Sequence, residues 1–421
     1  MAIAPRHFPA ANAALHNLSL GLAAMVGIPS QARLSVISPR RLKRLRLRTI
    51  LVIPLMVQLV GAVSLVGWLS FRSGEASVTE LAHKLHSEMG QRTHDQVTEY
   101  LEGAQRVNQV NVNALELGLI RLDEIQAARS YFWRQALTYP FIGYVGFANE
   151  EAQSLRVGWI NKQDSEKKPQ IAEQLTIGGG TLNFYDIDVP AEGKETAIDS
   201  IDEAQQPVRS VPEYDVRQRP FYDIVYDSQG PTWSEIYLNR AYPNFLQINA
   251  TSPYYGEDGQ LLGILTSQVG LNQISIFLQN LDLSETGRVY LLERDGSLVA
   301  TSREDIPLLR EEGEEERLRI KAIDSEDQLI QASAKFLLGE YTSFDAINTG
   351  DNQQMQFSLN GEVQFLRVAP FADQYGIDWL IVVVVPKAEF MGQITANTRN
   401  TIALCVAALI VAVGFCWLSA R

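Results

Sequence analysis

The stretch YDVRQRPFY, residues 214–222, places Arg217 and Arg219 two positions apart among three aromatic rings. An arginine guanidinium is a planar fork of N–H donors that binds a carboxylate with two parallel hydrogen bonds. Tyrosine hydroxyls and ring faces can close a pocket around a small ligand. These residue types therefore favour the binding of a carboxylate. The alternative for both arginines is surface ion pairing with the acidic residues beside them.

Two apolar stretches are long enough to cross a bilayer as helices. Residues 49–71 contain 23 residues without a charge and residues 401–420 contain 20, and helices of this length span roughly 30 Å at about 1.5 Å per residue. Trp68 and Trp417 lie near their ends, where aromatic anchors are common. The alternative for the first stretch is a cleaved secretory signal, but its apolar run exceeds the usual ~7–15 residues. We therefore predict two transmembrane helices.

The distribution of charge predicts how these spans are oriented. Residues 1–48 carry eight basic residues and no acidic one, and positive charge beside a span favours the cytoplasmic side. We expect a two-pass protein of the inner cell membrane, with 1–48 cytoplasmic and 72–400 extracytoplasmic. Since Arg421 is basic too, 27 of the 36 basic residues fall in 72–400, against 49 acidic ones. Such a negative surface does not favour nucleic acid or anionic lipid as a partner.

The pattern of residues 72–400 predicts an α+β fold. Residues 72–138 lack proline and carry apolar residues at helical spacing, which predicts a long stalk helix. Asp258–Gly259 and Asp295–Gly296 each separate two apolar runs, as in β-hairpins. Residues 271–281 have a short helical pattern. The run IVVVV before Pro386 predicts a buried strand, because it is too short for a membrane segment.

The order of these motifs is similar to that of a known family. YDVRQRPFY is followed by GPTWSEIY and DGQLLGIL, then by RDGSLVATS, and WLIVVVVP leads towards the second apolar stretch. Over residues 72–395 this order resembles the double-Cache sensor domain of bacterial chemoreceptors, histidine kinases and nucleotide cyclases. The resemblance implies two tandem PAS-like units after the stalk helix, a membrane-distal one at 139–283 and a membrane-proximal one at 284–395. It also implies a small ligand in the distal unit.

The resemblance further implies which residues hold the ligand. Many members bind amino acids through a pattern of Tyr, Arg, Trp-Tyr and Asp. Tyr214, Arg219 and Tyr222 match this pattern, whereas Phe221 replaces the usual Trp and Gln268 the usual Asp. An amide keeps an oxygen acceptor but lacks the charge that would hold an ammonium. We expect a carboxylate-bearing ligand, an amino acid or a related compound, whose ammonium end is held less well.

Three further residues near these motifs, Arg217, Trp233 and Tyr237, need separate interpretations. Arg217 does not match the family pattern, so we expect it to form a structural ion pair. Trp233 and Tyr237, in TWSEIY, either line the same pocket or pack in the core.

Enzymatic and metal sites are not favoured. All five histidines precede residue 95, so the folded units contain none for a Ser-His-Asp triad or a histidine-ligated metal. The acidic run 311–316 could gather a cation but is typical of a solvated face. Cys405 and Cys416 both lie in the second apolar stretch, so no disulfide is predicted outside it. We predict no catalysis, cofactor or metal, although a hydrolase built on paired carboxylates stays formally open.

Together these observations predict the sensing portion of a bacterial transmembrane receptor. Its architecture would be a stalk helix and two tandem PAS-like units flanked by two transmembrane helices, in a homodimer. We expect it to signal through the second span to a cytoplasmic output, such as a histidine kinase or nucleotide cyclase, that this chain does not include. The alternative is a surface module that binds a partner protein without a small-molecule pocket. Whether Arg219 faces an enclosed cavity or open solvent distinguishes the two.

Overall fold

The computed structural model describes residues 47–139, 141–160, 168–188, 206–280, 286–312, 316–348 and 354–390, with short pieces between 402 and 414. The chain divides into two compact units, residues 1–65 with 406–421 and residues 66–405. The sheets and cavities described below all belong to residues 66–405. The predicted N-terminal segment up to residue 46 lies outside the described residues, as does most of 401–420.

Within the described residues, no helix is both long and apolar enough to cross a membrane. The first predicted span, 49–71, is part of helix α1 (Leu47–Glu116). Both predicted spans stay predictions.

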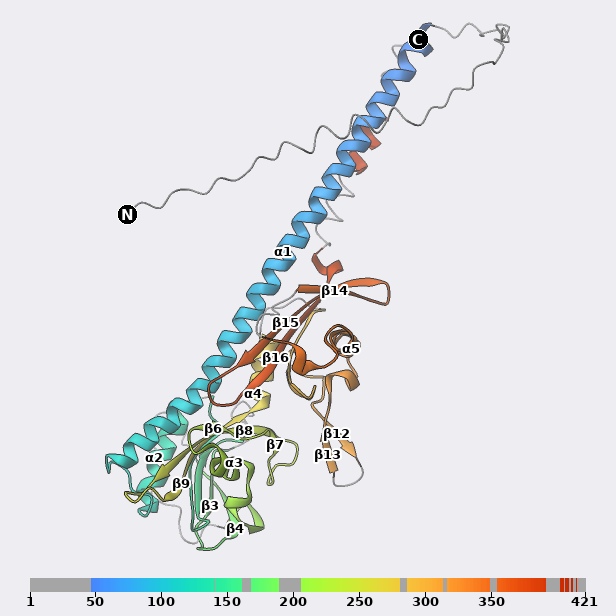
Figure 1. The fold of residues 1–421 in the computed structure, drawn as a ribbon. Coiled ribbons are helices and arrows are strands. Elements are labelled where there is room, and N and C mark those ends of the chain that lie inside the picture. Colours follow the sequence, from blue (N-terminus) through green and yellow to red (C-terminus); the bar gives the residue numbers. More distant parts are fainter. Residues whose placement is uncertain are drawn as a thin grey trace, which may run out of the picture. The chain divides into compact units, whose positions relative to one another are not determined.

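The predicted single stalk helix 72–138 is two helices in the structure. Helix α1 ends at Glu116, and eight residues separate it from helix α2 (Ile125–Thr138). Gly118 has φ +65°, its N–H donates to the carbonyl of Leu115, and the N–H of Leu119 donates to that of Ala114. This pair of bonds around a left-handed glycine is a Schellman motif, which ends a helix. The turn folds α2 back so that it packs on the sheet beside α1 (Figure 1).

The distal unit is built on one antiparallel sheet. Nine described strands form it in the order β5-β4-β3-β2-β1-β9-β8-β6, with β7 paired to β8. In chain order the strands are β1 (Tyr144–Asn149), β2 (Ser154–Gly158), β3 (Gln170–Gln174), β4 (Gly180–Asp186), β5 (Arg209–Tyr214), β6 (Thr232–Trp233), β7 (Tyr237–Leu238), β8 (Leu246–Tyr255) and β9 (Leu261–Gly270). Helix α3 (Pro220–Ser228) lies between β5 and β6.

The two faces of this sheet are covered by different elements. Neighbouring residues on a strand point to opposite faces. On β2, Leu155 and Val157 join an apolar core with α1 and α2, so Arg156 between them faces the other side. On β9, Leu265 joins the same core, and Gln268 lies on the opposite face. That opposite face packs against α3.

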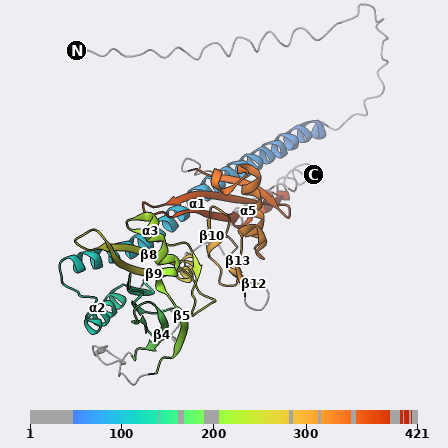
Figure 2. The same ribbon diagram turned by 60° about the horizontal axis from the view of Figure 1, so that its bottom comes forward.

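The proximal unit has a smaller antiparallel sheet. Its described strands follow the order β11-β10-β16-β15-β14, and a hairpin of β12 and β13 projects from it (Figure 2). The strands are β10 (Arg288–Glu293), β11 (Leu298–Thr301), β12 (Leu309–Glu312), β13 (Glu316–Arg319), β14 (Gln354–Leu359), β15 (Glu362–Ala372) and β16 (Asp378–Pro386). Helix α5 (Gln328–Tyr341) covers one face (Figure 1).

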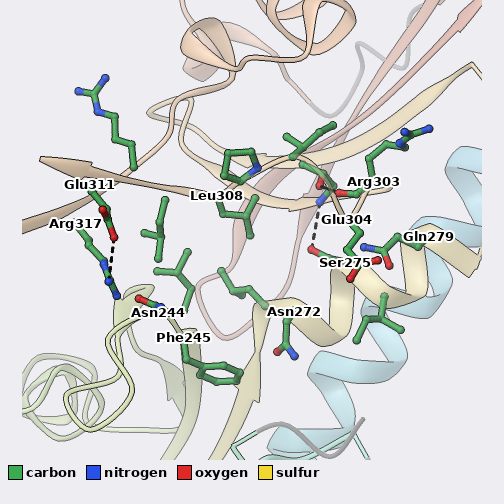
Figure 3. Close-up of a pocket in the computed structure, with 18 residues that line it drawn as sticks. Asn244, Phe245, Asn272, Ser275, Gln279, Arg303, Glu304, Leu308, Glu311 and Arg317 are labelled. Carbon is green, nitrogen blue, oxygen red and sulfur yellow. Dashed lines mark hydrogen bonds and ion pairs between the residues drawn. The ribbon is translucent and has the colours of Figure 1, made fainter. Parts of the chain in front are cut away.

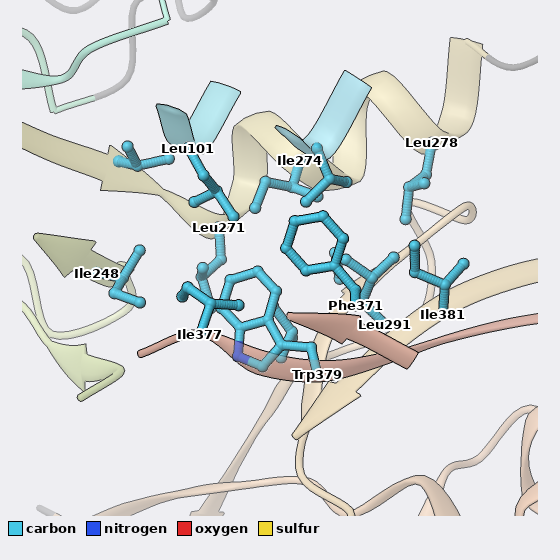
Figure 4. Packing of buried hydrophobic residues seen from close by; sticks show 14 of the residues in the cluster. Leu101, Ile248, Leu271, Ile274, Leu278, Leu291, Phe371, Ile377, Trp379 and Ile381 are labelled. Carbon is cyan, nitrogen blue, oxygen red and sulfur yellow. The ribbon is translucent and has the colours of Figure 1, made fainter. Parts of the chain in front are cut away.

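One apolar core joins α1, the distal unit, the proximal unit and the helix that connects these two units. Helix α4 (Leu271–Asn280) follows β9 directly, and Leu271, Ile274 and Leu278 pack with Leu101 of α1 and Trp379 of β16 (Figure 4). The core therefore connects the distal sheet to the inner face of the proximal sheet.

Several local predictions are confirmed. The two Asp-Gly pairs lie in the turns of the β8–β9 and β10–β11 hairpins, and α4 matches the predicted helix 271–281. The IVVVV run forms the buried strand β16. The predicted boundary at 283/284 falls among residues outside the description and stays a prediction.

Asn108 gives a test of how α1 holds the distal sheet. Its Nδ2 donates to the carbonyl of Ala250 at 2.8 Å and its Oδ1 accepts from Ser267 Oγ at 2.7 Å, with the side chain fully buried. Asn108→Ala leaves two buried groups without partners, so we expect the free energy of unfolding to fall by about 1–3 kcal/mol. Chemical denaturation measures the change. Gln109→Ala, on the exposed side of the same turn, is the matched control and should change it by less than about 0.5 kcal/mol. Equal losses in both variants would contradict this role.

Candidate functional site

A short turn and a helix start aim the two arginines of YDVRQRPFY in different directions. Tyr214 ends β5, and Asp215 caps a 3-10 turn, Val216–Gln218, by accepting from the N–H of Arg217. Arg219 follows as the extended N-cap residue of α3, with Pro220 in the first turn. Proline is favoured there because its fixed φ suits a helix start.

Arg217 is the structural arginine that the sequence predicts. Its Nη2 donates to Asp215 Oδ2 at 2.8 Å and its Nε to Oδ1 at 3.0 Å, while Nη1 donates to the carbonyl of Glu150. The prediction of an ion pair for Arg217 is confirmed.

Arg219 instead lines a cavity beneath α3. This cavity has a volume of about 20 Å³, room for about one water molecule. Its walls come from β1 to β5, β7 to β9, the start of α3 and the loop after β7. The lining residues are Tyr144, Arg156, Ala172, Leu182, Phe184, Tyr214, Arg219, Phe221, Tyr237, Asn239, Arg240, Ala241, Gln247 and Gln268.

Five of the seven predicted ligand residues are among them, namely Tyr214, Arg219, Phe221, Tyr237 and Gln268. The structure therefore brings together residues that lie up to 54 positions apart in the sequence, from Tyr214 to Gln268.

The other two predicted residues, Tyr222 and Trp233, lie elsewhere. Consecutive residues of a helix point about 100° apart, so Tyr222 turns away from Phe221, and its hydroxyl donates to Glu150 Oε1 at 2.7 Å. Trp233 faces the proximal unit, where its Nε1 donates to Asp373 Oδ2 at 2.7 Å. Both side chains are buried in structural contacts rather than directed into the cavity.

Arg156 is the residue that the sequence reasoning missed. It is 6% exposed, its Nη2 donates to the Tyr214 hydroxyl at 3.2 Å, and its guanidinium lies 5.2 Å from the ring centroid of Phe221. Its Nε has no hydrogen-bond partner, and no carboxylate among the described residues forms an ion pair with it. A buried cation is normally paired, because burial without a partner is costly. A charge between two apolar residues in the strand SLRVG was the available signal.

Arg219 is also held by an aromatic ring. Its guanidinium lies 5.7 Å from the ring centroid of Tyr237, which stacks on Phe221 with centroids 6.4 Å apart. Such cation–π contacts orient a guanidinium but leave its N–H donors in the ring plane available. Two guanidiniums therefore flank a pair of stacked rings.

Gln268 and Tyr237 complete the polar lining. Gln268 is 1% exposed, and neither its Oε1 nor its Nε2 has a hydrogen-bond partner. Tyr237 donates to Asn249 Oδ1 at 2.8 Å and accepts from Gln247 Nε2 at 2.6 Å. Burial raises the pKa of the hydroxyls of Tyr237 and Tyr144 above the ordinary value, so both stay protonated at neutral pH.

A larger cavity of about 560 Å³ lies within residues 66–405, between the distal and the proximal unit, along α4, residues 301–311 and Arg317 (Figure 3). Its Arg317 donates to Glu311 at 3.2 Å, and its Arg303 is paired with Asp305. Because these cations already have carboxylate partners, the smaller cavity, with its unpaired buried arginine, is the better candidate for an anionic ligand.

Comparison with known proteins gives a family match. The family model described as Cache domain matches residues 73–394. No curated protein matches the chain significantly.

Solved structures with a similar fold include three bacterial sensor domains. The ligand-binding domain of the Pseudomonas aeruginosa amino acid chemoreceptor PctB, in complex with L-Arg, is 17% identical, with 75% of this chain and 98% of that chain covered and a TM-score of 0.42. The ligand-binding domain of the Pseudomonas fluorescens chemoreceptor CtaA, in complex with L-isoleucine, is 14% identical. The match covers 76% of this chain and 98% of that chain, with a TM-score of 0.43. The sensory domain of the Campylobacter jejuni chemoreceptor Tlp3 is 12% identical, with coverages of 76% and 99% and a TM-score of 0.46. At these values the likenesses say nothing about this chain's ligand.

The Arg217–Asp215 pair predicts a pH-dependent contribution to stability. Hydrogen bonds from Arg217 hold the pKa of Asp215 below its ordinary value of 3.8. A carboxyl whose pKa is lower in the folded state stabilises the fold above its unfolded pKa, and this stabilisation is lost as the pH falls through the folded pKa. We expect Arg217→Ala to lower the free energy of unfolding at neutral pH by less than about 1 kcal/mol, because the pair is partly exposed and screened.

Urea denaturation of both proteins, at neutral pH and at about pH 3, measures this dependence. The difference between the proteins should shrink at the lower pH. A difference that is unchanged or larger there would contradict the assignment.

Proposed function

Since the chain belongs to the Cache domain family, we propose that it is a sensor module whose distal unit binds a small carboxylate-bearing ligand in the cavity lined by Arg156, Arg219 and Gln268. The observation that carries this proposal is the buried guanidinium of Arg156, which has no carboxylate partner among the described residues. A ligand's carboxylate supplies the missing counter-charge.

The chemistry of the lining supports binding of an anion. Hydrogen bonds to a charged group are worth about 1.5–3 kcal/mol each, and more of that value is kept in a site sheltered from water. The Arg156 and Arg219 forks can each engage a carboxylate, and the unpartnered amide of Gln268 can donate or accept. Phe221 and Tyr237 provide ring faces for the ligand's apolar part.

Ligand entry requires some movement of the lining. A cavity of about 20 Å³ is too small for any amino acid or comparable acid. Arg219 is half-buried and Arg240 is exposed, so these two side chains can swing outwards, whereas Arg156 is held by the sheet. Binding would then close the site around the ligand.

The position of Arg219 at a cavity supports a small ligand over the alternative of a partner protein. A surface that docks a protein would present Arg219 to solvent alone, whereas here the half-buried Arg219 lies over Tyr237 at the partly open edge of the cavity. Binding rather than catalysis is proposed, because no histidine follows residue 94 and no acidic residue lines the cavity among the described residues.

The proposal extends to signalling across a membrane. The apolar stretches 49–71 and 401–420 and the basic segment 1–48 support a two-pass protein of the inner membrane, with residues 72–400 extracytoplasmic. In a homodimer, ligand binding would shift the equilibrium between two arrangements of the helices that enter the membrane. This shift would act on a cytoplasmic output. The contact of Trp233 with Asp373 supports this route, because it joins the strand after α3 to the turn before β16.

A ligand screen on the full chain tests the proposal. The detergent-purified protein is heated in the presence of amino acids, other small carboxylates, amines or purines, and the shift of its melting temperature is measured. A ligand at 100 times its Kd stabilises by about 2.7 kcal/mol. We expect a carboxylate-bearing hit, which Arg219→Ala removes because the guanidinium fork is lost.

Arg217→Ala is the matched control and should keep the hit, since Arg217 is paired with Asp215 outside the cavity. Hits without a carboxylate, or a carboxylate hit that survives Arg219→Ala, would overturn the proposal.

A further inference from the structure

The charge of the candidate cavity is unbalanced. Among the residues that the structure describes, its lining contains Arg156, Arg219 and Arg240 but no Asp or Glu. Three acidic residues within two positions of its walls are engaged with other residues, because Asp215 binds Arg217, Glu173 binds Arg129 and Asp186 accepts from Gln170. The lining therefore offers three positive charges and no negative charge.

The two inner guanidiniums come from different elements. Arg156 projects from β2 and is buried between the sheet and α3. Arg219 projects from the start of α3 and is half-buried at the edge of the cavity. Each lies over a different ring of the stacked pair, Arg156 over Phe221 and Arg219 over Tyr237. Two separate forks suit two separate anionic groups better than one carboxylate, which a single fork already satisfies.

A cationic group on the ligand would find no charged partner. The unpartnered Gln268 amide offers one neutral acceptor, but two guanidiniums in the same small cavity repel an ammonium. The same amide can turn its Nε2 towards a carboxylate instead.

From this lining we infer that the ligand of the distal cavity carries two negative charges and no positive one, and that its class is the small dicarboxylates. The inference rests on the proposed function and narrows it. Arg156 holds the inner carboxylate, Arg219 the outer one, and Gln268 selects against an ammonium.

Isothermal titration of the full chain tests the ligand class with matched compounds. Malonate, succinate and glutarate vary the spacing of the two carboxylates. Succinamate replaces one carboxylate of succinate by an amide, and aspartate adds an ammonium to it. We expect at least one dicarboxylate to bind about tenfold or more tightly than succinamate and than aspartate, because each comparison changes one charge–charge contact.

Two substitutions separate the inner arginine from the outer one. Arg156→Met should lower the affinity for the best dicarboxylate by about tenfold or more, with less effect on monocarboxylates, because only the second carboxylate loses its partner. It should leave the melting temperature of the ligand-free protein unchanged or raised, since it removes a buried charge without a counter-ion. If Arg156 served only the fold, Arg156→Met would lower the melting temperature and leave the ratio of dicarboxylate to monocarboxylate affinity unchanged.

Gln268→Asp is a second variant, independent of Arg156. The new carboxylate repels a dianion and attracts an ammonium, so the preference for succinate over aspartate should fall about tenfold or more. An unchanged preference would overturn the role of Gln268 and the argument from charge balance.

The outcomes distinguish this inference from the proposed function. If amino acids or monocarboxylates bind as tightly as dicarboxylates and depend on Arg219, the proposed function stands and the dicarboxylate inference is wrong. If no carboxylate binds, both are wrong. If a dicarboxylate binds best and depends on both arginines, both are supported.

Discussion

Neighbouring residues on a strand point to opposite faces of a sheet, and the distal unit depends on this constraint. Leu155, Val157 and Leu265 fill the core between the sheet and the helices α1 and α2. That burial holds the sheet in place. The residues between them, Arg156 and Gln268 among others, are thereby directed to the other face, where they line the cavity. Apolar residues are buried on both faces, but only the face covered by α3 also carries the buried polar groups of the cavity.

The difference between paired and unpaired arginines shows which ones serve the fold. Arg129 of α2 and Glu173 of β3 form a pair with both side chains 11% exposed, and Arg288 is paired with Asp327 in the proximal unit. Arg156 is buried as deeply as these, and its contacts within the described part of the chain are a neutral tyrosine hydroxyl and a ring face. Burial of a cation without a counter-charge costs free energy, and under the proposed function a negatively charged ligand would offset that cost.

The cavity is close to the element that connects the two units. Gln268 lies three residues before Leu271, the first residue of α4, and α4 packs in the core shared by α1 and the proximal sheet. A second connection starts from α3, which is followed by Trp233, and Trp233 donates a hydrogen bond to Asp373 of the proximal unit. Under the proposed function, a displacement of the lining would act on elements that are packed against the proximal unit.

Much of the fold could be predicted from the sequence because its signals are local. The two Asp-Gly hairpins, the helix α4 and the buried strand β16 each depend on a few consecutive residues. The end of α1 depends on an equally local signal, Gly118, whose left-handed conformation ends the helix inside the predicted stalk. For the candidate site, three residues of the family pattern, Tyr214, Arg219 and Gln268, line one cavity, and their role in binding a ligand stays a prediction.

The sequence by itself determined which segments become strands, turns and helices, and which residue types are available to bind an anion. Only the tertiary structure decided which side chains meet. Arg156 reaches the cavity because its side chain projects from β2 on the face of the sheet that α3, distant in the chain, covers. Tyr222 leaves it because one helical step turns the side chain by about 100°. Charge balance depends on such long-range neighbours, so the absence of an acidic partner for Arg156 among the described residues became visible only in the folded unit.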